Sequence, residues 1–134
     1  MKEIILFMAL TFSAITFAQQ KNQTSIDSCT ATKASILYKK NAHASYYHDK
    51  FNGRKTASGK RFNNDDFTAA HKKFPFGTIL KVTNELNNNF VIVEITDRGP
   101  FVKGREIDLS KRAFMDIASN KKSGLVYVTI EILK

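Results

Sequence analysis

An acidic residue at the end of an apolar strand pattern is the clearest indication of chemistry in this sequence. Asp97 and Arg98 follow the largely β-branched run 90–95 and precede Gly99 and Pro100. This Gly-Pro pair predicts a turn, because glycine permits backbone angles that other residues avoid and proline fixes φ. A strand that delivers a carboxylate into a turn can present an acid or a charge to a substrate. The alternative is an Asp97 that only accepts turn N–H groups, with Arg98 as its ion-pair partner.

A second candidate for chemistry is His71, which ends the possible strand 67–71. A histidine in this place is either a hydrogen-bonded structural residue or a group that exchanges protons near neutral pH. No metal site is expected, because His43, His48 and His71 share no ligand-like spacing with other donors. We also expect no cofactor.

The N-terminal segment predicts export. Lys2 precedes an apolar run over residues 4–17, and Thr16-Phe17-Ala18 supplies small residues at the cleavage positions of a signal peptide over residues 1–18. The run is too short to favour a transmembrane segment. No cysteine directly follows the cleavage site, so a lipid anchor is not predicted, and the single Cys29 cannot form an internal disulfide. We therefore expect a periplasmic or secreted protein.

Charge and length narrow the function classes. The 134-residue chain carries a formal net charge of +9, which in an exported protein favours anionic surfaces such as the cell wall or lipid headgroups. Nucleic acid is not an expected partner in that compartment. The segment 19–41 is polar and predicts a linker, and the remaining chain is long enough for one compact domain over residues 42–134.

The elements of that domain are mostly short strands. Alternating and β-branched patterns predict strands over residues 43–48, 67–71, 78–83, 90–96 and 125–133. One short helix is predicted near residues 110–119, where Ser110 is a good N-cap and Ala113, Phe114 and Ile117 have helical spacing. Several short strands with one helix indicate a small β-rich barrel or sandwich.

Six motifs, in order along the chain, resemble a known family. They are Ala44–Tyr47, Phe51–Gly59, Thr68–His71, Pro75–Thr78, Thr96–Phe101 and Ile107–Ser110. Together they closely resemble the rare lipoprotein A (RlpA-like) family of septal-ring lytic transglycosylases. The resemblance implies a double-psi β-barrel and peptidoglycan glycan strands as the ligand.

The resemblance also implies a reaction. Lytic transglycosylases are carbon–oxygen lyases that cleave between N-acetylmuramic acid and N-acetylglucosamine, leaving a 1,6-anhydromuramyl end, in cell-wall remodelling and cell separation. One protein group protonates the leaving oxygen and then takes the proton of the attacking 6-hydroxyl. The motif matches assign the catalytic roles to Asp97 and His71, with His71 either hydrogen-bonded to the Asp97 carboxylate or shuttling its proton.

The third functional position of the family departs from the pattern, because Lys60 occupies the place where the family commonly has Glu. A cation facing Asp97 would oppose its use as an acid and would favour binding of anionic groups. Asp65 or Asp66 could reach the vacated place. Lys60, Arg98 and the possible sugar-stacking residues Tyr46 and Tyr47 are the expected substrate-binding residues.

The substitution at position 60 leaves an alternative to catalysis, which is a non-catalytic, expansin-like module that holds peptidoglycan without cutting it. A hydrolase acting on another polysaccharide is disfavoured, because the sequence offers no convincing second carboxylate to activate water.

Overall fold

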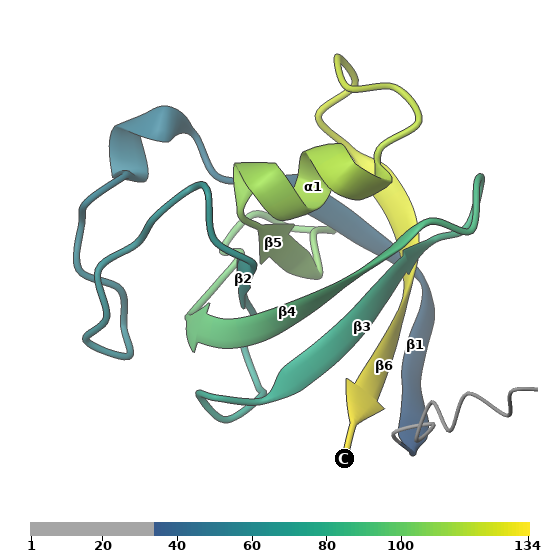
Figure 1. Ribbon diagram of the computed structural model, residues 1–134, viewed down its shortest axis with the longest axis horizontal. Coiled ribbons are helices and arrows are strands. Elements are labelled where there is room, and N and C mark those ends of the chain that lie inside the picture. Colours follow the sequence, from purple (N-terminus) through teal and green to yellow (C-terminus); the bar gives the residue numbers. More distant parts are fainter. Residues whose placement is uncertain (1–33) are drawn as a thin grey trace, which may run out of the picture. The chain divides into compact units, whose positions relative to one another are not determined.

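The structure, a computed structural model, describes residues 34–134 and shows a closed six-stranded barrel with one helix against it (Figure 1). The strands follow one another around the barrel in the order β1-β5-β2-β4-β3-β6. Two neighbouring pairs, β1 with β5 and β2 with β4, are parallel, and the other pairs are antiparallel. The bounds are β1 Ser35–Tyr46, β2 Thr68–Ala70, β3 Ile79–Asn84, β4 Phe90–Asp97, β5 Ile107–Leu109 and β6 Val126–Leu133.

Alternation along the strands explains why this sequence closes into a barrel. In β3 the side chains alternate between buried and half-buried positions, and in β4 Val91, Val93 and Ile95 point inward. Side chains of this kind fill the interior of a small barrel. The fully buried core includes Leu80, Val82, Ile95, Ile107, Leu109, Phe114, Ile117, Val128 and Ile130.

Most predicted elements are confirmed, and two are corrected. The predicted strands over 67–71, 78–83, 90–96 and 125–133 correspond to β2, β3, β4 and β6. The first strand begins at Ser35 rather than near His43, so part of the segment expected to be a linker belongs to the barrel. Its polar side chains are mostly exposed, while its backbone pairs with β6 from Ser35 opposite Leu133. The strand β5 was not predicted.

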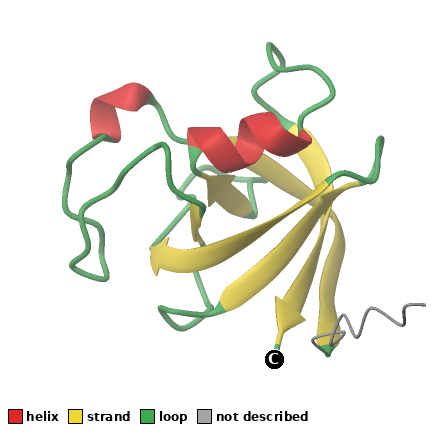
Figure 2. Ribbon diagram, in the orientation of Figure 1, coloured by secondary structure: helices red, strands yellow, loops and turns green. Residues whose placement is uncertain are grey.

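The predicted helix is confirmed as α1, Lys111–Ile117. Ser110 is its N-cap, and the Ser110 hydroxyl accepts a hydrogen bond from the Ala113 N–H, which satisfies one of the free donors at the helix start. Ala113, Phe114 and Ile117 are buried, as their helical spacing predicts. Figure 2 shows this helix in red, lying across the strands of the barrel.

A long connection between β1 and β2 positions the candidate site. It contains the short 3₁₀ helix Asp49–Phe51 and a tight turn over residues 56–60. The Ser58 N–H donates to the Thr96 carbonyl oxygen at 3.2 Å. This connection therefore lies beside the end of β4, where Asp97 ends the strand.

The predicted signal peptide, Cys29 and the first part of the expected linker lie outside the described residues. Within residues 34–134, no helix is long and apolar enough to cross a membrane.

Candidate active site

The carboxylate of Asp97 is held at the end of β4 by donors from three segments. Its Oδ1 accepts hydrogen bonds from the main-chain N–H groups of Ala57 and Arg98, both at 2.9 Å. Its Oδ2 accepts from the Tyr47 hydroxyl at 2.7 Å. A carboxylate oxygen offers two lone pairs, so these bonds occupy Oδ1 fully and leave one lone pair on Oδ2. Oδ2 is therefore the oxygen that can exchange a proton with a substrate.

Tyr47 is a constant hydrogen-bond donor in this arrangement. Burial, reinforced by the hydrogen bond to Asp97, raises the pKa of Tyr47 well above its ordinary value. Its ring packs against Phe62, with centroids 4.5 Å apart, and edge-on against Phe51. The structure thus places the hydroxyl of Tyr47 on the candidate acid, a contact that the sequence did not reveal.

Asp97 lines a cavity with a volume of about 580 Å³, called the larger cavity here because a neighbouring one is smaller. Its lining is rich in cationic side chains, namely Lys50, Arg54, Lys55, Arg98 and Arg105. Its aromatic lining consists of Tyr46, Tyr47, Phe51, Phe62 and Phe101. Aromatic faces and forked N–H donors are the groups that bind sugar rings and their carboxylate substituents.

Phe101 is a binding candidate that sequence reasoning missed. Its side chain is 84% exposed at the cavity, although a phenyl ring left in water forgoes its hydrophobic stabilisation. Gly99, at φ +124°, adopts a conformation that side chains rarely tolerate, and a Cβ there would lie 3.5 Å from the Phe101 ring. Phe51, flanked by Lys50 and Arg54 at 5.2 and 5.5 Å from its centroid, was also missed.

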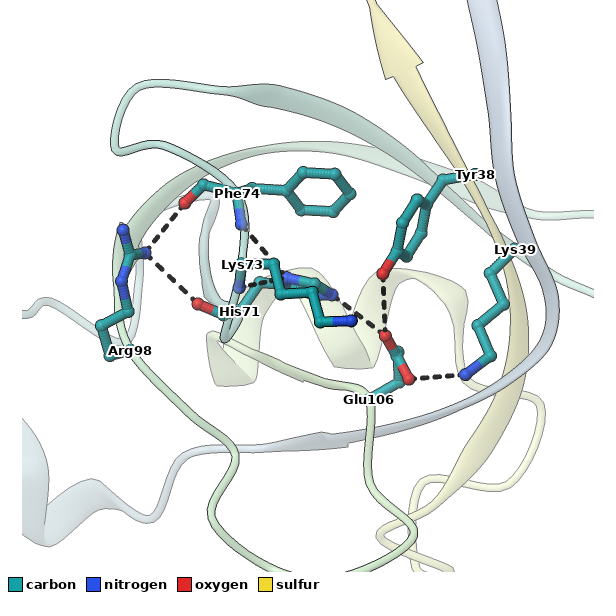
Figure 3. Close-up of polar contacts among 7 residues, drawn as sticks. All are labelled: Tyr38, Lys39, His71, Lys73, Phe74, Arg98 and Glu106. Atoms are coloured by element: carbon teal, nitrogen blue, oxygen red, sulfur yellow. Dashed lines mark hydrogen bonds and ion pairs between the residues drawn. The ribbon is translucent and has the colours of Figure 1, made fainter.

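The His71 imidazole is buried, and its two ring nitrogens have partners other than the Asp97 carboxylate. Figure 3 shows these contacts of His71 with Glu106 and with the turn that follows His71. Nδ1 accepts from the main-chain N–H groups of Lys73 and Phe74 at 3.0 and 3.4 Å, so Nε2 carries the ring hydrogen. Nε2 donates to Glu106 Oε1 at 3.1 Å. The expected hydrogen bond from the His71 side chain to the Asp97 carboxylate is therefore wrong. Instead, the main-chain N–H of His71 donates to the main-chain carbonyl oxygen of Asp97.

Arg98 connects the His71 turn with the cavity. Its Nη1 donates to the carbonyl oxygens of His71 and Phe74 at 3.3 and 2.9 Å. Its guanidinium lies 3.9 Å from the centroid of Phe76 and lines the larger cavity beside Asp97. The structure thus places Arg98, Tyr46 and Tyr47 at the same cavity as Asp97, as a substrate-binding role requires.

The buried state of His71 predicts a dependence of stability on pH. Burial lowers the pKa of His71 below its ordinary value, although the hydrogen bond to Glu106 acts in the opposite direction. As the pH falls, His71 is therefore protonated at a higher pH in the unfolded chain than in the folded protein. The free energy of unfolding should fall as the pH drops below about 6.5, the ordinary histidine value. Urea denaturation at pH 7.5 and 5.5 measures this fall, and His71→Asn should reduce it. An equal slope in both proteins would contradict the assignment.

Lys60 faces a different cavity from the one at Asp97. Its Nζ lies 2.9 Å from Glu94 Oε1, and both residues line the smaller cavity, of about 250 Å³, together with Ser58, Phe76 and Thr96. Lys60 therefore does not line the cavity of Asp97, where its cation would have opposed the use of Asp97 as an acid. Glu94, whose partner the sequence could not identify, is the carboxylate nearest to the Lys60 ammonium.

The Lys60–Glu94 pair can be tested by exchanging its charges. Lys60→Glu alone would place two carboxylates side by side and should lower the free energy of unfolding by about 1 kcal/mol or less, because both groups are partly in solvent. The double variant Lys60→Glu/Glu94→Lys should recover that loss, as measured by urea denaturation. Additive losses in the double variant would show that the pair does not form.

The remaining expected residues are only partly available for binding. The Tyr46 ring packs on Phe114, with centroids 4.7 Å apart, so one face is used by the core. Asp65 and Asp66 are exposed and line neither cavity. Arg105, which lines the larger cavity but was not an expected site residue, is paired with Asp108 at 2.6 Å, so part of its guanidinium is already used within the protein.

The barrel and the site define a class of protein. The family described as lytic transglycolase matches residues 39–130, and the chain belongs to this family. The expected double-psi β-barrel is confirmed. Solved structures agree on the fold: an expansin of Clavibacter michiganensis in complex with cellohexaose has a TM-score of 0.56 at 16% identity, over 75% of this chain and 51% of that one. The Streptomyces papain inhibitor has a TM-score of 0.55 at 21% identity, over 75% and 96% of the two chains.

Sequence relatives confirm the resemblance to the RlpA-like proteins. The endolytic peptidoglycan transglycosylase RlpA of Pasteurella multocida is 50% identical over 103 residues, which are 77% of this chain and 35% of that protein. The protein of the same name from Haemophilus influenzae is 52% identical over 96 residues, or 72% of this chain and 33% of that protein. The chain thus spans about a third of the length of these curated relatives.

Proposed function

We propose that this protein is an exported lytic transglycosylase that cleaves peptidoglycan glycan strands between N-acetylmuramic acid and N-acetylglucosamine. The observation that carries the proposal is the Asp97 carboxylate, which is oriented by Tyr47, Ala57 and Arg98 at a cavity lined by aromatic and cationic side chains. The names of relatives about 50% identical to this chain support the same substrate class. The product is a 1,6-anhydromuramyl end, and the process served is cell-wall remodelling and cell separation.

In the proposed reaction a single carboxyl group serves twice. Oδ2 of protonated Asp97 donates its proton to the glycosidic oxygen, and the bond from that oxygen to the muramyl anomeric carbon breaks. The muramyl 6-hydroxyl oxygen then attacks the anomeric carbon while Oδ2 takes its proton. Asp97 is regenerated in its starting form, and water is not consumed. Tyr47 keeps Oδ2 directed to the cavity through both steps.

His71 takes part in this reaction through the main chain. Its main-chain N–H donates a hydrogen bond to the Asp97 carbonyl oxygen, and its carbonyl oxygen accepts one from Arg98 Nη1. Because both ring nitrogens have protein partners, the imidazole is not free to exchange a proton with a glycan. His71 is thus a positioning residue in the proposed site.

Substrate binding in the proposed site uses both cavities. Arg98 and Phe101 would contact sugar rings next to the scissile bond, with Tyr46 and Tyr47 forming the aromatic wall of the larger cavity. Lys60, which is 64% exposed, would meet anionic substituents of the strand in the smaller cavity. The turn over residues 56–60 contributes Thr56 to the larger cavity and Ser58 and Lys60 to the smaller one, so a glycan strand that uses both cavities would cross this turn.

The test is product analysis after incubation of the purified protein with isolated sacculi. The proposal requires release of muropeptides with 1,6-anhydro ends, from intact sacculi or from sacculi stripped of stem peptides. If the protein sediments with sacculi but releases no soluble product, the proposed enzyme activity is refuted. That result would support the alternative, a non-catalytic peptidoglycan-binding module.

A further inference from the structure

A cluster around Glu106 joins three segments that are distant in the sequence (Figure 3). Glu106 Oε1 accepts from His71 Nε2 at 3.1 Å and from the Tyr38 hydroxyl at 3.3 Å. Its other oxygen, Oε2, accepts from Lys39 Nζ at 2.7 Å. Tyr38 and Lys39 belong to β1, His71 follows β2, and Glu106 precedes β5. The carboxylate is therefore the common acceptor of the cluster.

The position of this carboxylate is set by the barrel. The Glu106 N–H donates to the His43 carbonyl oxygen at 2.9 Å, directly before β5 pairs with β1. The Tyr38 ring stands edge-on to His71 and to Phe74, with centroids 5.6 and 4.6 Å away. Partial burial acts to raise the pKa of Glu106, but the hydrogen bonds from Lys39 and His71 outweigh it and lower that pKa.

The cluster continues to the cavity through the turn over residues 71–74. His71 Nδ1 accepts hydrogen bonds from the main-chain N–H groups of Lys73 and Phe74. The carbonyl oxygens of His71 and Phe74 in turn accept hydrogen bonds from Arg98 Nη1. Among residues 34–134, the Nε and Nη2 groups of the Arg98 guanidinium have no hydrogen-bond partner, and Arg98 lines the cavity of Asp97. A shift of this turn would therefore move free donors that face the cavity.

We propose that Glu106 is a positioning residue for the active site, because its carboxylate fixes the His71 ring and, through the turn over residues 71–74, the Arg98 guanidinium beside Asp97. The role of Arg98 toward a glycan rests on the proposed function. The coupling of Glu106 to the turn does not, because it concerns the free protein. Glutamine at position 106 keeps an acceptor for Nε2–H, whereas alanine removes it.

The first test measures the turn in the full chain without a ligand. Glu106→Ala should speed hydrogen exchange of the Lys73 and Phe74 amides by about tenfold, since local opening governs such exchange. It should also change the NMR signal of the Arg98 Nε–H. Glu106→Gln should restore both. Glu131→Ala is the matched control, because Glu131 is as buried as Glu106 and contacts Lys81 instead. Unchanged exchange in Glu106→Ala would overturn the proposal.

The second test asks whether Glu106 acts through Arg98. Dissociation constants for soluble glycan strands, released from sacculi by an amidase, are measured in an Asp97→Asn background. Glu106→Ala should weaken binding by about three- to tenfold, and should weaken it no further once Arg98→Ala is present. Additive losses would overturn the coupling. If the wild-type protein binds these strands but releases no anhydro product, the proposed function fails and the coupling can still hold.

Discussion

Asp97→Asn should reduce release of 1,6-anhydromuropeptides from sacculi by at least about 10²-fold, the lower range for loss of a general acid–base group. Asparagine has nearly the same shape, and its side-chain oxygen can still accept from the Ala57 and Arg98 N–H groups. The fold and the cavity should therefore be preserved, which circular dichroism and urea denaturation would check. What the variant lacks is the carboxyl proton that Asp97 would donate from Oδ2.

A matched control for this variant is Asp116→Asn. Asp116 lies on α1, is 47% exposed and contacts Arg112 at 3.9 Å, away from both cavities. It should keep wild-type release. Unimpaired release by the Asp97 variant would mean that another group supplies the proton, and the assignment of the active site would be wrong.

The second large effect concerns stability. His71→Ala should lower the free energy of unfolding by about 3 kcal/mol, because it opens a cavity and leaves buried donors without an acceptor. The imidazole is 1% exposed, and its Nδ1 is the acceptor of the Lys73 and Phe74 amides. Asparagine at this position offers an acceptor oxygen near the place of Nδ1 and should recover part of the loss. Urea denaturation at pH 7.5 measures both.

The same variants show whether His71 only positions its neighbours or itself exchanges a proton with the substrate. If His71 acts only through the turn, His71→Asn should recover activity together with stability. Restored stability without restored product release would show that the imidazole itself exchanges a proton with the glycan. That result would contradict the geometry in which Glu106 and two main-chain amides use both ring nitrogens.

Local patterns were sufficient to predict most of the barrel. The alternation in residues 78–83 and 90–96 reflects side chains that point in turn to the core and to the surface. The start of β1 could not be predicted in this way, since residues 35–41 are mostly exposed and gain their strand conformation from pairing with β6. The short β5 likewise depends on its neighbours β1 and β2.

The candidate site was predictable as a set of residues but not as a set of contacts. The end of a strand and the following turn indicated Asp97, and family motifs indicated His71. The partners of these residues lie far away in the sequence: Tyr47 is 50 positions from Asp97, and Glu106 is 35 positions from His71. Such pairings follow from the closure of the barrel, and a single sequence does not record them. For the same reason the sequence could not show that Lys60 contacts Glu94.

Product analysis in water enriched in oxygen-18 shows whether the protein cleaves glycan strands without consuming water, as the role proposed for Asp97 requires. Sacculi are incubated with the wild-type protein, and the released fragments are analysed by mass spectrometry. The released fragments should have 1,6-anhydro ends that carry no oxygen-18, and these fragments should disappear with Asp97→Asn. Reducing ends labelled with oxygen-18 would instead identify a hydrolase, in which Asp97 activates or assists the attack of water.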